Sequence, residues 1–348
     1  MKPAGPEKNN RVVYLEALVK KKKKVLIVVH DSPDPDALAS AFGFRYLLQH
    51  WKIPAIITYR GIIGRAENRA MIKALKIELV PFSRINMKDF SLTALVDTQP
   101  GAGNNPLPAM RIPDIVIDHH MPFYETSRQA SFLDIRTDYG STSTIITEYL
   151  VQTGIEDKNR KVATALLYGI KSDTRDLGRE TAASDMNAYL RLYPHVLFKV
   201  LSRIEHPKLS RNHFRLFSRA INRALIDKDL IIADLGEIET ADNLAEMADF
   251  LIRMDNIRWV LCLGEYDGSL FFSIRTTHRK AHAGIIAQKI ARGSGGGGGH
   301  CMVAGGKIDT PGKYEDKSSL VKARFLKEIK RPDFIGEPLA GTNAAAVC

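Results

Sequence analysis

The sequence predicts an α/β fold, with an N-terminal doubly wound parallel sheet, a smaller C-terminal α/β domain and a cleft between the two. Three observations support this prediction. Short, apolar, β-branched runs alternate with segments that carry apolar residues at helical spacing. The first run, VLIVV from Val25, has the composition of a strand that is buried on both faces, as in a parallel sheet. With 348 residues, the chain exceeds the size at which one hydrophobic core usually stops growing, so we expect two domains.

The expected elements of the first domain follow in the order strand, loop, helix. A polar loop, Asp31 to Asp36, comes after the strand at Val25. A helix is expected from Ala37 to Trp51, because apolar residues recur there at helical spacing and acidic residues stand beside its N-terminus. The pattern then repeats, with strands expected at Ala55 to Tyr59, Leu92 to Asp97 and Asp114 to Asp118, and a helix at Arg65 to Leu75.

The second half of the chain predicts further helices and then a second set of strands. From Ser143 to about Tyr193 the pattern is mainly helical, with a polar interruption at Lys171 to Thr181. We expect a first domain at residues 1–197, a basic and apolar helical connector at residues 198–226, and a second domain at residues 227–348. Strands of the second domain are expected at Leu230 to Asp234, Trp259 to Gly264 and Leu270 to Arg275.

A glycine run near the end, GSGGGGGH from Gly293 to His300, is too rich in glycine to predict regular structure. It is either a flexible linker or a loop that cradles a phosphate group. The loop is favoured, because the run ends in His300 and leads into the apolar, small-residue segment CMVAGG.

Composition limits the kind of protein. The three cysteines, Cys262, Cys301 and Cys348, form no CxxC pair, which argues against a zinc site or a dithiol redox centre. No apolar run approaches the roughly 18 residues of a membrane-spanning helix. The segment Met1 to Asn10 lacks the apolar stretch of a secretory signal. We therefore expect a cytoplasmic protein that has no membrane partner.

The charge favours a polyanionic partner. The net charge is +11 and the pI is near 9.4, and clustered basic residues raise the local concentration of phosphates. Five lysines in a row, Lys20 to Lys24, are either a nucleic-acid contact or the solvated end of a helix. The solvated end is the favoured interpretation.

Histidines and aspartates stand where the expected strands end. His30, Asp97 and the trio Asp118 to His120 follow three strands, and carboxyl ends of parallel strands share one edge of the sheet. Asp34 and Asp36 stand in the loop after His30, and Asp173 lies among apolar and small residues. Mixed imidazole and carboxylate ligands favour a transition metal over magnesium. Four aspartates and two histidines can hold two ions about 3.5–4 Å apart, an arrangement that suits displacement at phosphorus.

Four segments resemble the motifs of the DHH phosphoesterases, in the family's order: HDSPDPDALAS from His30, VDTQP from Val96, DHH from Asp118 and SDTRDLGRET from Ser172. Downstream, FFSIRTT from Phe271 and GGGGGHCMVAGG from Gly295 resemble the DHH-associated domain of the nanoRNA-degrading and RecJ-like branches. The resemblance spans roughly residues 20 to 310.

The resemblance implies a role for each motif residue. His30, Asp34 and Asp97 would hold the first metal ion, and the second would be held by Asp36, Asp97, His119 and Asp173. Asp97 would bridge the two ions. His120 would face the scissile phosphate, either as a charge-stabilising donor or as a proton donor to the leaving oxygen, and Asp118 would orient its neighbours. The expected cofactor is two divalent ions per chain, with manganese favoured over magnesium or cobalt.

In the second domain, the resemblance implies a substrate site. Arg275 and His300 would bind a phosphate or base, assisted by the backbone of Gly297, Gly298 and Gly299. The expected partner is a short single-stranded RNA or DNA, or a nucleotide. Cys301 stands where the family commonly has proline, and Arg175 and Asp176 replace a small residue, so substrate contacts are expected to differ in detail.

The favoured function is a manganese-dependent phosphodiesterase or phosphatase for short oligonucleotides, linear dinucleotides or 3′-phosphoadenosine 5′-phosphate-type nucleotides. Two other enzymatic functions stay open: pyrophosphate or polyphosphate hydrolysis, and a RecJ-like single-strand exonuclease. A nucleotide-binding module without catalysis is the alternative from another class. A homodimer stays open as the oligomeric state.

Overall fold

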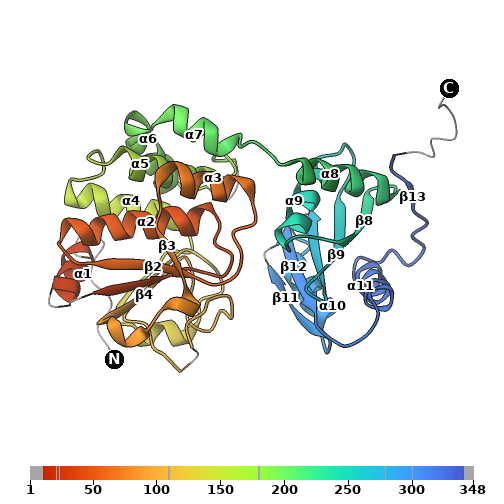
Figure 1. The fold of residues 1–348 in the computed structure, drawn as a ribbon, viewed down its shortest axis with the longest axis horizontal. Helices are drawn as coiled ribbons and strands as arrows, with labels where there is room; N and C mark the ends of the chain where they lie inside the picture. Colours follow the sequence, from red (N-terminus) through yellow and green to blue (C-terminus); the bar gives the residue numbers. More distant parts are fainter. Residues whose placement is uncertain are drawn as a thin grey trace. The chain divides into compact units, whose positions relative to one another are not determined.

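The computed structural model of the protein describes residues 11–340, except residues 21, 23, 109, 179, 180, 279 and 300. The chain divides into two compact units, residues 1–207 and residues 208–348 (Figure 1). Each unit has its own sheet and its own hydrophobic core. The predicted α/β fold, with a parallel sheet in the first unit and a smaller second unit, is confirmed.

The first unit is built on a six-stranded parallel sheet in the order β3-β2-β1-β4-β5-β6. The chain winds outward in both directions from β1 and β4, so this pair is the point where the strand order reverses. The central strands are apolar and buried, as the VLIVV run predicts. The strands are β1 Val25–Val28, β2 Ala55–Tyr59, β3 Leu79–Pro81, β4 Leu92–Val96, β5 Ile115–Asp118 and β6 Phe132–Ile135.

Local caps fix where the helices of the first unit begin. The Asp34 carboxylate accepts a hydrogen bond from the Ala37 amide at the start of α2, and the Ser141 hydroxyl accepts one from the Thr144 amide at the start of α4. Gly154, in the left-handed region, ends α4. The helices are α1 Arg11–Lys20, α2 Pro35–His50, α3 Ala66–Leu75, α4 Thr142–Thr153, α5 Arg160–Asp173, α6 Ala183–Leu192 and α7 Phe198–Glu205.

The two faces of this sheet are covered differently. Val25 and Ile27 point to the face on which the α-helices pack, and these residues belong to the main core (Figure 1). Leu26 and Val28 point to the other face, where Met87 and its neighbours cover them. That second face carries 3₁₀ helices, η2 Phe82–Arg84, η3 Met87–Asp89 and η4 Glu125–Gln129, in place of long α-helices; a further one, η5 Tyr193–His195, follows α6.

The second unit contains a seven-stranded mixed sheet in the order β11-β12-β10-β9-β8-β7-β13. Among the described strands of this second sheet, only the β8–β9 pair is parallel. The strands are β7 Ala224–Asp227, β8 Leu230–Glu237, β9 Trp259–Tyr266, β10 Ser269–Thr276, β11 Gly295–Gly299, β12 Val303–Ile308 and β13 Glu337–Pro338.

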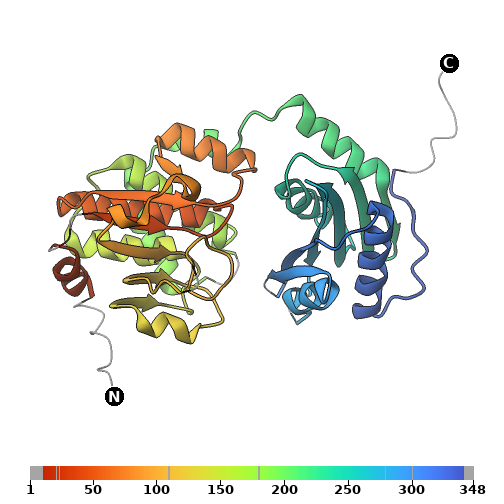
Figure 2. The same ribbon diagram turned by 60° about the horizontal axis from the view of Figure 1, so that its bottom comes forward.

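Four helices cover the two faces of the second sheet (Figure 2). One core includes residues of α10 Ala283–Ala291 and α11 Tyr314–Glu328, and the other includes residues of α8 Arg211–Arg223 and α9 Asp242–Leu251. The segment expected as a helical connector, residues 198–226, contains α7 of the first unit and α8 of the second.

The prediction that the glycine run is irregular is wrong for Gly295–Gly299, which form strand β11. This strand pairs antiparallel with β12, which itself contains two glycines, Gly305 and Gly306. The backbone of α10 lies so close that a Cβ on Gly297 would collide with the Ala287 carbonyl oxygen. Glycine is therefore required here by close packing of backbone on backbone.

Across the part of the chain that the structure describes, no helix combines the length and apolar character needed to traverse a bilayer.

Candidate metal centre

Three strands of the first unit end beside one another and deliver the predicted side chains to one edge of the sheet. His30 follows β1, Asp97 follows β4, and β5 ends at Asp118, directly before His119 and His120. Three groups of potential ligands converge there, each with ligand atoms within 4.8 Å of one another: His30, Asp34, Asp97; Asp36, His119, Asp173; and Asp97, His119, His120. All six predicted metal ligands are thus brought together in one place.

His30 lies between two carboxylates. Its Nε2 is 3.5 Å from Asp34 Oδ1 and 3.7 Å from Asp97 Oδ2. The Asp31 carbonyl oxygen, 2.9 Å away, can only accept a hydrogen bond, so the ring donates from Nδ1 and turns the Nε2 lone pair toward the carboxylates. Nδ1 is thus occupied, and Nε2, which faces the carboxylates, is the ring nitrogen left to bind a metal ion in place of a proton.

His119 occupies a matching position on the other side of Asp97. Its Nε2 is 3.1 Å from Asp173 Oδ2, 3.7 Å from Asp97 Oδ1 and 3.9 Å from Asp36 Oδ2. The Tyr139 carbonyl oxygen lies 3.1 Å from Nδ1 and fixes the same tautomer. Asp97 therefore turns one oxygen toward His30 and the other toward His119.

Among the predicted metal ligands, two buried atoms have no partner with hydrogen-bond geometry in the described part of the chain: Asp97 Oδ2 and His119 Nε2. Asp97 is 1% exposed, and leaving such an atom unsatisfied costs about 1–3 kcal/mol. Both atoms face the groups of potential ligands. Divalent cations at these positions would satisfy both, so the residues fit the predicted cofactor.

The centre also concentrates negative charge. Burial and the nearby Asp97 and Asp173 carboxylates raise the pKa of Asp36 well above its ordinary value, and burial raises the pKa of Asp97. Burial works to lower the pKa of His30, but Asp34 and Asp97 raise it to about 10. Carboxylates crowded this closely need positive charge between them, which bound cations supply.

His120 and Asp118 form a pair beside the centre. Asp118 is fully buried, and its Oδ1 lies 2.9 Å from His120 Nδ1. The Gln99 amide donates to the other oxygen, Asp118 Oδ2, at 2.7 Å. Of the three histidines, His120 has the most exposed side chain, 30% against 16% for His30 and 11% for His119. His120 thus stands on the accessible side of the centre.

The N-terminus of α4 supports the centre, a role that the sequence analysis missed. The Thr142 and Ser143 amides donate to the two oxygens of Asp36, at 2.7 and 2.9 Å. The Thr142 hydroxyl donates to Asp97 Oδ1 at 2.7 Å. The polar stretch STST from Ser141 marks a helix start, but no sequence signal reveals that this helix points at the aspartates.

Close packing of α5 keeps the same carboxylates in place. Gly169 lies one turn before Asp173, and a Cβ there would come within 3.1 Å of Asp36 Oδ1 and would collide with Ser143. Asp97 itself has a φ of 62°, a left-handed conformation that aspartate tolerates better than most residues. Such conformations concentrate at functional sites.

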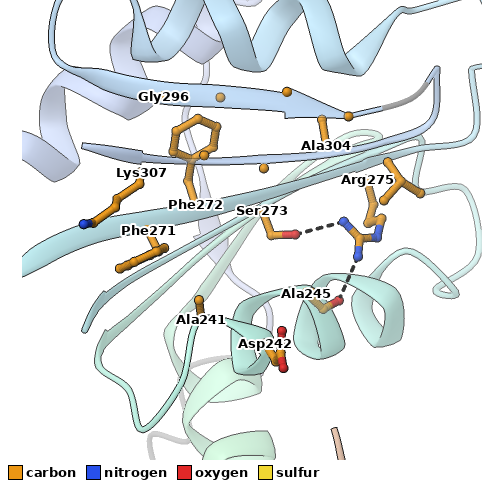
Figure 3. A pocket seen from close by; sticks show the side chains of 16 residues that line it. Ala241, Asp242, Ala245, Phe271, Phe272, Ser273, Arg275, Gly296, Ala304 and Lys307 are labelled. Carbon is orange, nitrogen blue, oxygen red and sulfur yellow. Dashed lines mark hydrogen bonds between the residues drawn. The ribbon is translucent and has the colours of Figure 1, made fainter. Parts of the chain in front are cut away.

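The predicted substrate residues of the second unit line a pocket of about 490 Å³ (Figure 3). Gly297, Gly298 and Gly299 lie along it, together with Arg275. The Arg275 guanidinium is already engaged, because it donates to Asp249 and to the Ser273 hydroxyl and is 4% exposed. His300 lies outside the described residues.

Comparison with known families finds a match in each part of the chain. Residues 24–170 match the DHH family, N-terminal domain, and residues 227–327 match the DHHA1 domain. An uncharacterized protein of Methanocaldococcus jannaschii is 36% identical over 306 residues, covering 87% of this chain and 62% of that protein.

One further relative and one solved structure have names that refer to an activity. A cyclic-di-AMP phosphodiesterase of Geobacillus thermodenitrificans is 26% identical over 324 residues, covering 87% of this chain and 48% of that protein. The chain thus spans 62% of the length of the Methanocaldococcus protein and 48% of the length of the Geobacillus protein. The crystal structure of an exopolyphosphatase-related protein from Bacteroides fragilis has a TM-score of 0.73 at 14% identity, covering 95% of this chain and 100% of that one. At this identity the likeness concerns the fold alone.

Proposed function

We propose that this protein is a phosphoesterase that binds two divalent metal ions and hydrolyses short oligonucleotides or nucleotides. The matches to the DHH family, N-terminal domain, and to the DHHA1 domain support this proposal. The first ion is assigned to His30, Asp34 and Asp97. The second is assigned to Asp36, Asp97, His119 and Asp173. Manganese is the proposed metal, because imidazole ligands favour it over magnesium.

The observation that carries this proposal is the two-sided position of Asp97. Its two oxygens lie 3.7 Å from the Nε2 atoms of two different histidines, His30 and His119. A carboxylate that serves two ligand groups supports a pair of ions about 3.5–4 Å apart, as in two-metal hydrolases. Bound there, the ions supply charge stabilisation at the attacking and leaving oxygens of a phosphate ester.

His120 is proposed to bind the scissile phosphate. Asp118 and, behind it, Gln99 orient the imidazole, so that it meets the substrate in one fixed direction. The ring is the most accessible of the three histidines, and a donor that is already oriented can stabilise charge as it develops on phosphate oxygen.

A nucleotide substrate is favoured over pyrophosphate by the second unit. Its pocket of about 490 Å³ has the size of sites that bind small organic ligands, and exposed glycine backbone lines one wall. One relative carries the name cyclic-di-AMP phosphodiesterase, which adds cyclic dinucleotides to the compounds worth testing.

The test is product analysis with purified full-length protein, first stripped with EDTA and then given manganese, magnesium or cobalt. Substrates are end-labelled oligonucleotides of graded length, cyclic and linear dinucleotides, 3′-phosphoadenosine 5′-phosphate and pyrophosphate. We expect manganese-dependent cleavage of the nucleotides. Hydrolysis of pyrophosphate alone would refute the nucleotide assignment, and full activity without any divalent ion would refute the metal centre.

A further inference from the structure

Helix α8 carries a row of arginines that the metal centre does not use. Arg211, Arg215, Arg219 and Arg223 recur at every fourth position, and all four are exposed. Four residues advance about 6 Å along a helix, so the row extends about 18 Å. Leu216 and Ala220 of α8 pack into the core of the second unit.

No direct ion pair joins this row to a carboxylate among the described residues; the Glu239 carboxylate beside the helix accepts a hydrogen bond from the Asn212 amide instead. The helix has no acidic residue, and among the described residues no carboxylate lies within 4 Å of these four guanidinium groups. Their hydrogen bonds go to neutral acceptors: Arg215 donates to the Asn212 side chain, and Arg219 donates to the carbonyls of Leu235 and Glu237. The nearby Glu246 contacts His213, 3.2 Å away, on the inner side of the helix.

An exposed aromatic ring stands within this basic surface. Phe214 is 64% exposed and lies one turn from Arg211. Phe217, three residues later on the same helix, packs against Phe250 and against the core. Phe214 is not part of either core cluster of the second unit, so its ring is accessible to a ligand.

We propose that α8 is a binding surface for single-stranded nucleic acid, separate from the metal centre. A row of cations at regular spacing suits a chain of phosphates better than a single phosphate. An aromatic ring beside such a row suits an unpaired base, because single-strand binding combines phosphate contacts with stacking on aromatic side chains. An acidic peptide would satisfy the arginines and leave Phe214 without a function.

The test measures binding without turnover, so its outcome is independent of the proposed activity. Full-length protein in EDTA is titrated against a fluorescein-labelled single strand of about 20 nucleotides, longer than α8 itself, which extends about 20 Å. Fluorescence anisotropy is recorded over a range of salt concentrations. Each phosphate contact with a single strand contributes about 0.7 to the slope of log K against log salt.

The double variant Arg211→Gln/Arg215→Gln is expected to lower the magnitude of that slope by about 1.4, for two lost contacts. Arg219 and Arg223 are left unchanged, because Arg219 also holds backbone carbonyls of the neighbouring strand. The matched control is Lys327→Gln/Lys330→Gln, which removes the same charge from two exposed positions elsewhere in the second unit. An unchanged slope in the α8 variant, or an equal change in the control, would overturn the proposal.

Phe214→Ala separates stacking from charge. We expect about tenfold weaker binding with an unchanged salt slope, because stacking of one base does not involve counterions. Unaltered affinity would remove the base contact. Poly-aspartate of matched charge is tested as a competitor beside the unlabelled single strand. If it competes equally well, the surface binds any acidic polymer, and the nucleic-acid assignment is overturned. Circular dichroism confirms that each variant is folded.

Discussion

Asp97 combines two features that seldom meet in one residue, a left-handed backbone and a carboxylate shared between two histidines. We predict that Asp97→Asn lowers manganese-supported turnover by at least about 100-fold, because changes to residues that merely orient metal ligands already cost 10–100-fold. Asparagine keeps the side-chain shape and tolerates the left-handed region, so the fold is expected to persist.

The measurement pairs steady-state rates with the metal content of the purified variant. Asp267→Asn is the control, since Asp267 also has a positive φ and is exposed in the turn between β9 and β10. Two bound ions and ordinary rates in Asp97→Asn would contradict the bridging assignment.

Thr142 provides a second prediction at the scale of single residues. Thr142→Val removes the hydroxyl that donates to Asp97 Oδ1 and keeps the side-chain volume. We expect manganese affinity to fall by about 10–100-fold, because the carboxylate loses the group that orients it. Thr147→Val in the same helix removes a buried hydroxyl that donates to the Ser143 carbonyl and to none of the proposed metal ligands, so the manganese affinity of this variant should stay unchanged. The dissociation constants are measured by calorimetric titration.

Sequence patterns predict the types of ligand at this centre, and the geometry explains why they do not reveal the residues that support those ligands. His30, Asp97 and His119 follow buried strands, and parallel strands bring their carboxyl ends together. Thr142 and Gln99 act through contacts between segments far apart in the chain, and such contacts leave no periodic pattern.

At the scale of elements, the strands that the sequence predicts are those whose amino-acid composition alone favours a strand. β1, β2 and β4 are apolar and rich in β-branched residues, and they form where expected. β3 is only three residues long, and β11 consists of glycine, so pairing partners determine both. Tertiary context of this kind overrides local propensity.

The glycine strand gives a paired prediction. Gly297→Ala would place a methyl group against the Ala287 carbonyl oxygen of α10, whereas nothing lies within 4 Å of the Cβ position of Gly298. We therefore expect Gly297→Ala to lower the free energy of unfolding by about 1–3 kcal/mol and Gly298→Ala to change it by less than about 0.5 kcal/mol. Urea unfolding of both variants measures the difference. Equal losses would show that strand β11 does not pack on α10 in this way.

Asp234 connects β8 to α11 and predicts a pH dependence. Burial works to raise its pKa, but hydrogen bonds from Lys322, Ser318 and Tyr314 lower it below the ordinary value. A lowered carboxylate pKa in the folded state stabilises the protein above the unfolded pKa, and this stability is lost as the pH falls through the folded pKa.

The variant Asp234→Asn isolates that contribution. At pH 6 it should be less stable than the wild type by about 1–2 kcal/mol, a value reduced for the partial exposure of the pair. Below about pH 4 the difference should shrink, because the wild-type carboxylate begins to take up a proton. A difference that stays constant from pH 6 to pH 3 would argue against the ionised form as the stabilising one.

At the scale of the whole molecule, chain length predicted two domains, and the structure has two units with separate sheets. Both sets of strands were foreseen in outline from alternating apolar segments. The order of the strands in the second sheet is not predicted by the sequence. Hydrophobic patterning shows which residues are buried, but it does not determine which strands lie side by side.

Metal binding is expected to stabilise the molecule unevenly. All six proposed ligands belong to the first unit, so manganese at 100 times its dissociation constant should add about 2.7 kcal/mol to the stability of that unit. Hydrogen exchange with and without manganese measures this by segment. Protection should appear around residues 30–36 and 142–143, and equal protection throughout residues 208–340 would contradict a centre built by the first unit alone.

Gly169 has a consequence for how this protein can change over time. It binds nothing and reacts with nothing, yet the space for even one methyl group is taken by Ser143, Ala39 and Asp36. In a library that samples every amino acid at every position, we expect this site to reject substitutions as strictly as the aspartates themselves. Intolerance to substitution would therefore be as strong at a glycine that only leaves room for the proposed metal ligands as at the ligands themselves.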